Sequence, residues 1–200
     1  MLSSFVLDLV YFFITATRKL SAWGFLLWFC CFIAAPFLSQ STNPIKQRIY
    51  ALLHASAQLI TTCVFFLFYF FYLFDFNMIK PKGRQAGFFD IHFVHLVPFL
   101  WMILFTTDPP NPVSKYTIGQ YFIPLYVLNN FLWAMIFINN DITTVKTFGL
   151  TLDMQWPYEF MHWLTVSDWF YMTFFAGVLV HFAVVFIDQS KLIRKFFFDY

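Results

Sequence analysis

Apolar residues along this chain gather into five long runs that short polar breaks separate. The runs lack the strict alternation of a half-buried strand. At 1.5 Å per residue, about 20 apolar residues cross the ~30 Å hydrocarbon layer of a bilayer. We therefore predict an all-α polytopic membrane protein, with one membrane domain over residues 1–200 and about five transmembrane helices. These helices are predicted at residues 22–38, 50–74, 88–106, 120–138 and 167–187.

Several breaks carry helix start and stop signals. Asn43 can cap a helix whose first residue is Pro44, where the missing amide proton costs nothing. The sequence DPPNP after residue 107 cannot continue a helix. Pro98 and Pro124 lie inside predicted spans, where they should kink the helix and free backbone carbonyls that other groups must satisfy.

The first residues form an apolar stretch that is too short to span a bilayer. Residues 5–16 include Asp8, and Arg18 and Lys19 follow directly. We predict that 1–21 forms an interfacial helix at the headgroups, with a kinked extension of the first span as the alternative.

The longest connection joins the last two spans. Its segment Thr143–Leu152 is rich in β-branched residues on either side of Gly149. Such a pattern predicts a small β-hairpin.

Composition supports a membrane location. The chain is 60% hydrophobic and 11% charged, with a mean hydropathy of +0.69. A soluble domain carries about 25% charged residues. The net charge of +2 argues against a nucleic-acid partner.

The basic residues give no orientation signal. The 12 Lys and Arg residues divide equally between the two predicted sides of the membrane, so the positive-inside rule favours neither. We interpret this balance as typical of a subunit that partners hold in place. Phenylalanine, with 32 residues, outnumbers leucine, and a T-rich organelle coding strand would produce that bias. Both observations favour a mitochondrial inner-membrane location.

Two histidines are predicted at matching depth in one leaflet. His54 lies early in the span 50–74 and His181 late in the span 167–187, so both are near the same side. Paired histidines can ligate haem b between membrane helices. Gly177, one turn from His181, would admit the macrocycle or allow a close helix contact. The alternative is that each histidine hydrogen-bonds a neighbouring helix or a lipid headgroup.

The span 50–74 also carries a polar stripe. His54 and Gln58, with Thr61 or Thr62, repeat at helical spacing and share one face. Because polar groups are costly in lipid, we expect this face to contact protein. A proton or quinone path is the alternative.

A second histidine group lies on the opposite side of the membrane. His92, His95 and His162 are candidate metal ligands together with the nearby carboxylates, although helix geometry directs Asp90 away from the histidine face. The alternative is an interfacial cluster that hydrogen-bonds headgroups or a partner. The carboxylates in this group are Asp90, Glu159 and Asp168.

The sequence favours a structural role over a catalytic one. It contains no GxSxG, P-loop, GxGxxG or HExxH motif. We predict a non-enzymatic membrane subunit of a mitochondrial respiratory-chain or ATP-synthase complex, with other membrane subunits and phospholipid as partners and no required cofactor. The alternatives are a haem b or quinone-binding electron-transfer anchor and a small metal-dependent lipid-modifying enzyme.

Overall fold

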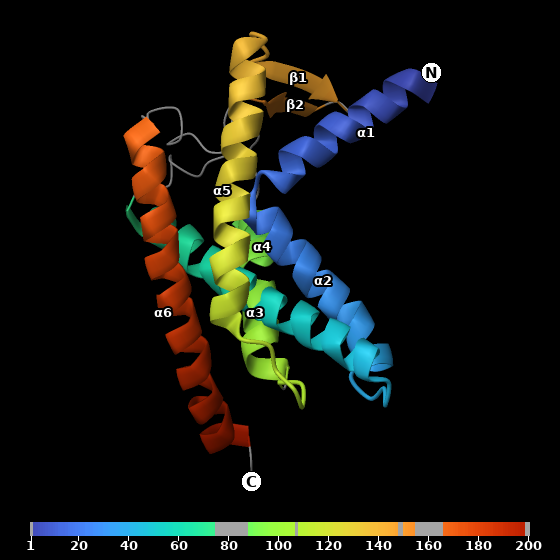
Figure 1. The fold of residues 1–200 in the computed structure, drawn as a ribbon, viewed down its shortest axis with the longest axis vertical. Coiled ribbons are helices and arrows are strands. Elements are labelled where there is room, and N and C mark those ends of the chain that lie inside the picture. The colour runs from blue at the N-terminus through green and yellow to red at the C-terminus, as the bar shows by residue number, and fades with distance from the viewer. Residues whose placement is uncertain (1, 75–87, 107, 148–149, 155–165, 199–200) are drawn as a thin grey trace.

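A computed structural model describes residues 2–74, 88–106, 108–147, 150–154 and 166–198. These residues form an all-helical structure apart from one small hairpin (Figure 1). The elements are α1 (Leu2–Thr17), α2 (Leu20–Leu38), α3 (Pro44–Phe74), α4 (Phe88–Leu100), the π-helix η2 (Trp101–Phe105), α5 (Lys115–Asn139), β1 (Thr144–Thr147), β2 (Leu150–Asp153) and α6 (Val166–Phe198).

Within the described residues, four helices are long and apolar enough to cross a membrane. They are α2, α3, α5 and the Tyr171–Lys191 part of α6. The predicted span 88–106 is helical as α4 and η2, but its apolar part, His92–Phe105, is shorter than the other four. The part of the chain that the structure describes therefore has four helices of spanning length, and the fifth span stays a prediction.

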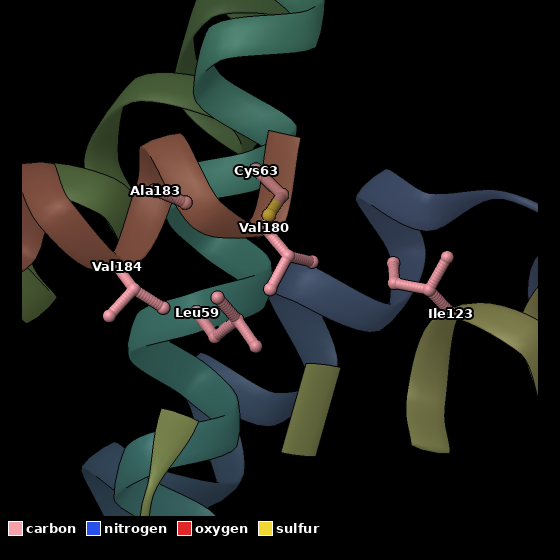
Figure 2. Packing of buried hydrophobic residues seen from close by; sticks show 6 residues of the cluster. All are labelled: Leu59, Cys63, Ile123, Val180, Ala183 and Val184. Atoms are coloured by element: carbon pink, nitrogen blue, oxygen red, sulfur yellow. The ribbon is translucent and has the colours of Figure 1, made fainter. Parts of the chain in front are cut away.

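Helix α3 lies at the centre of the structure and contacts α2, α4, α5, α6 and η2 (Figure 1). One hydrophobic cluster joins Leu59 and Cys63 of α3 to α5 and α6 (Figure 2). The polar stripe of α3 is buried as well, which confirms that this face contacts protein. The remaining members of the cluster are Ile123, Val180, Ala183 and Val184.

The start of α3 follows the predicted capping pattern. The side-chain oxygen of Asn43 accepts hydrogen bonds from the amides of Ile45, at 2.9 Å, and Lys46, at 3.4 Å. Pro44 is the first helical residue. The cap satisfies two amides that have no partner within the helix, and the helix therefore begins before the apolar run does.

A π-helical turn follows Pro98 where α4 ends. The carbonyl of Met102 in this turn accepts a hydrogen bond from Nε2 of Gln58 at 3.1 Å and from Oγ1 of Thr106 at 2.7 Å. A buried amide of α3 thus satisfies a carbonyl in the last turn of this helical segment, while partners for a carbonyl freed by Pro98 itself stay a prediction.

The chain between Thr17 and Leu20 is not helical, and Lys19 is extended, with φ −97° and ψ 122°. Helix α1 is therefore a separate helix that leaves the direction of α2 (Figure 1). It contacts α2 and both strands. Its location at the lipid headgroups stays a prediction.

The predicted hairpin is confirmed. Strands β1 and β2 pair antiparallel, with Thr144 opposite Asp153 and Thr147 opposite Leu150. The residue after β2, Met154, offers its carbonyl to Nη1 of Arg18, whose guanidinium lies 5.7 Å from the ring centroid of Phe137. The hairpin therefore packs against the junction of α1 and α2.

Candidate functional site: an ion cluster at one end of the helices

Four ionisable residues from different parts of the chain gather around Asp108, which lies between η2 and α5. Nζ of Lys191 is 2.6 Å from one carboxylate oxygen of Asp108 and 3.2 Å from Oδ1 of Asp188. Nζ of Lys115 and Nδ1 of His54 each lie 3.9 Å from the other oxygen of Asp108. We call these five residues the Asp108 cluster.

The cluster forms because several elements end on the same side. His54 lies early in α3, Lys115 is the first residue of α5, and Asp188 and Lys191 are one turn apart late in α6. Antiparallel spans bring such positions together, as the sequence predicts for the start of the second span and the end of the last. Ser114 caps α5 by accepting a hydrogen bond from the amide of Thr117 at 3.4 Å, which fixes the start of that helix.

The charges of the cluster compensate one another. His54 is 1% exposed and Lys115 7%, whereas the Asp108 side chain is 24% exposed. Burial raises the pKa of the Asp108 carboxyl, but the hydrogen bond from Lys191 and the positive charges of Lys115, Lys191 and His54 outweigh it, and the pKa lies below its ordinary value. An ionised Asp108 thus neutralises cations that would be costly to bury alone. The arrangement favours a structural clamp between α3, α5 and α6.

The two histidines proposed as haem ligands have different surroundings. His54 is buried, with Asp108 as its charged neighbour and the ring of Tyr50 at a centroid distance of 5.8 Å. His181 is exposed, and its Nδ1 lies 3.0 Å from the hydroxyl of Tyr116. These contacts match the alternative in which each histidine bonds a neighbouring group, and haem ligation stays a prediction.

One of the two predicted roles of Gly177, a close helix contact, is not found, and the other, room for a macrocycle, stays a prediction. A Cβ atom added at Gly177 would meet nothing within 4 Å, so the prediction of a close contact with another helix is wrong for the described residues. The close contact lies instead at Gly119, where a Cβ atom would be 2.5 Å from Cγ1 of Val180. The absence of a side chain at Gly119 therefore allows α5 and α6 to approach.

The proposed metal ligands of α4 pack against aromatic residues of α3. Nδ1 of His92 lies 2.9 Å from the hydroxyl of Tyr69. The ring of His95 stacks on Phe68, with the centroids 3.9 Å apart. His162 and Glu159 lie outside the described residues. Among the residues that the structure describes, no group of three potential metal ligands occurs, and the metal site stays a prediction.

Sequence reasoning missed Asp108, which is the centre of the cluster. Its segment DPPNP was interpreted only as a helix stop. The predicted topology could have pointed to it. The order of the spans places the loop that contains Asp108 on the same side of the membrane as His54, Lys115 and Lys191.

Comparisons of this chain with protein-family models, with curated proteins and with solved structures give no match.

Proposed function

We propose that this protein is a non-catalytic integral membrane subunit that packs against other membrane subunits of a larger assembly. One observation carries the proposal: a hydrogen-bonded polar pair, His181 and Tyr116, is exposed on the outer face of α5 and α6. A protein that met only lipid on this face would be expected to carry apolar side chains there.

The position of His181 makes the pair unusual. The residue lies inside the apolar stretch Tyr171–Lys191, two turns before Asp188 of the Asp108 cluster, where hydrocarbon would offer few polar partners. Its Nδ1 faces the Tyr116 hydroxyl, and the described residues supply no partner for Nε2. A polar side chain of a neighbouring subunit would satisfy this nitrogen.

Aromatic residues on the same two helices provide the apolar area that a subunit interface needs. Phe174 and Phe182 of α6 and Tyr121 of α5 are largely exposed. In the most apolar 18-residue stretch of α5, and in that of α6, 22% is buried within the chain. Most of the surface of these helices is thus available to a partner or to lipid.

The class of assembly follows from the sequence. The high phenylalanine content and the equal division of basic residues support a mitochondrial inner-membrane complex of the respiratory chain or the ATP synthase, with bound phospholipid around the exposed helices. The clamp of the Asp108 cluster supports a structural rather than catalytic role.

Blue-native electrophoresis of native membranes solubilised in a mild detergent tests the proposal. The wild-type chain is expected to migrate in a band far larger than its 23.9 kDa mass. His181→Leu should move a large fraction of the chain to a smaller species. Phe29→Leu is the matched control, since Phe29 is exposed on α2, away from α5 and α6, and should leave the large band unchanged.

Migration of the wild-type chain as a single free species would overturn the proposal. A shift caused equally by His181→Leu and Phe29→Leu would show that the polar pair has no part in the contact. Thermal unfolding of both purified variants verifies that neither has lost its own fold.

A further inference from the structure

A cavity of about 340 Å³ lies between α2, α3 and η2. Its floor is formed by Cys31, Tyr50 and Met102, which are buried, and its outer wall by Phe32 and Phe105, which are exposed. The cavity therefore opens toward the outside of the helices, on the side where lipid would lie. Its volume is within the range of pockets that hold small organic ligands, roughly 300–1,000 Å³.

Tyr50 provides an unused hydrogen-bond donor in this cavity. The residue as a whole is 7% exposed, but its oxygen is not one of the fully enclosed polar atoms, and among the described residues no hydrogen bond to it is found. The hydroxyl is therefore accessible from the cavity and can donate to a group that enters it. An acceptor that enters from outside the chain would satisfy this group.

The other hydroxyl groups of the cavity have already used their protons. The hydroxyl of Ser39 donates to the carbonyl of Ala35 at 2.5 Å, and that of Thr106 donates to Met102 at 2.7 Å. No charged side chain lines the cavity. The chemistry therefore fits a neutral ligand with a hydrogen-bond acceptor.

Aromatic rings define the shape of the ligand. Trp101 lies between the two rings of the outer wall, with centroid distances of 5.3 Å to Phe32 and 5.4 Å to Phe105. Offset and edge contacts with such rings favour a flat unsaturated ring over a saturated one. A lipid acyl chain would fill space here but would leave the Tyr50 hydroxyl unsatisfied.

We propose that this cavity binds the ring of a neutral lipophilic carbonyl compound of the quinone class, with the Tyr50 hydroxyl donating to a ring carbonyl. The ring would lie against Trp101, and the hydrophobic tail would leave between Phe32 and Phe105 into the lipid. Because the cavity does not include His181 or Tyr116, this site is independent of the proposed subunit interface.

Binding of decylubiquinone to the purified full-length chain in detergent tests the site. Saturable quenching of tryptophan fluorescence is expected for the wild-type protein. Tyr50→Phe removes only the hydroxyl and should weaken binding about tenfold, which corresponds to about 1.4 kcal/mol. Tyr171→Phe is the matched control, because Tyr171 is exposed on α6 and does not line the cavity.

A second variant separates the cavity from general partition into the detergent micelle. Ala35→Phe adds a ring to the cavity wall and should abolish saturable quenching, while thermal unfolding verifies that the variant is folded. Wild-type affinity in either Tyr50→Phe or Ala35→Phe would overturn the proposal. Equal competition by methyl palmitate would also overturn it, since a saturated acyl chain would then be the occupant.

Discussion

Helix α3 and the other three spanning helices have nearly the same hydropathy but very different burial. For the most apolar 18-residue stretch of each helix, the mean hydropathy is 1.9 in α3 and 1.8, 1.6 and 1.8 in α2, α5 and α6. Half of this stretch is buried within the structure in α3, compared with 17% in α2 and 22% in each of α5 and α6. Hydropathy therefore identifies spanning helices but does not reveal which one is central.

The difference lies in the side chains along α3. Its buried face carries small and weakly polar residues, among them Ala55, Ala57 and Thr62, whereas the outer faces of α5 and α6 carry large apolar residues. Small residues allow neighbouring helices to approach, and polar ones are tolerated only where protein covers them. The polar stripe marks the central helix.

The largest expected effect on stability comes from removing a buried side chain of α3. Leu59→Ala removes a fully buried side chain from the cluster in Figure 2 and should lower the free energy of unfolding by about 3 kcal/mol. Leu132→Ala on α5, where the side chain is 51% exposed, should change it by less than about 0.5 kcal/mol. Reversible unfolding in detergent micelles measures both, and equal losses would contradict the central role of α3.

The next largest expected loss of stability comes from a substitution in the Asp108 cluster. Asp108→Asn removes the carboxylate shared by Lys115, Lys191 and His54, and only Lys191 keeps a second carboxylate in direct contact, that of Asp188. The substitution should cost about 2 kcal/mol, less than loss of a fully buried pair because Asp108 is partly exposed. Asp188→Asn is the control, and at its exposed position the loss should stay below about 1 kcal/mol. The melting temperatures of the two purified variants, followed by circular dichroism, compare these losses. A larger loss at Asp188 would show that the clamp is centred elsewhere.

A third and smaller effect concerns the contact of α5 with α6. Gly119→Ala places a methyl group against Val180 and should destabilise the protein by about 1 kcal/mol. Gly177→Ala meets no neighbour and should be neutral or stabilising by up to about 1 kcal/mol, because alanine favours a helix. Thermal unfolding of the pair, with Gly119→Ala combined with Val180→Ala as a rescue, measures the contact. A double variant no more stable than Gly119→Ala alone would argue against steric overlap as the cause.

The smallest expected effect is on the way the stability of the protein falls at acidic pH. The pKa of Asp108 is lower in the folded protein than its ordinary value of 3.8. The resulting stability is fully present above that value and is lost as the pH falls through the lower folded-state pKa. Melting temperatures between pH 7 and pH 3 should therefore decline less in Asp108→Asn than in the wild type. Parallel declines would show that Asp108 does not contribute.

Most of the helices could be predicted from the sequence, because apolar runs report membrane depth directly. The run 22–38 corresponds to α2, and 120–138 lies within α5. Helix ends were harder to predict. Helices α3 and α6 continue through residues such as Lys46 and Lys191, because a helix that leaves the hydrocarbon keeps its backbone hydrogen bonds in water.

The candidate sites could be predicted only in part. Spacing along α3 was sufficient to predict that Gln58 and His54 face protein. It could not show that Asp108 meets Lys191, since that contact joins residues 83 positions apart in sequence, nor that Tyr50 lines a cavity with Trp101. Such contacts depend on how helices pack, and a single sequence contains little information on packing.

The bond between Arg18 and Met154 has a consequence for biosynthesis. The chain emerges from the ribosome with its amino end first, and 136 residues separate these two partners. Helix α1 and the following spans are therefore made well before the hairpin that holds Arg18 exists. Helix α1 reaches its final position only after residue 154 has been made, and a ribosome that stalls before that residue would release a chain whose α1 is not yet docked.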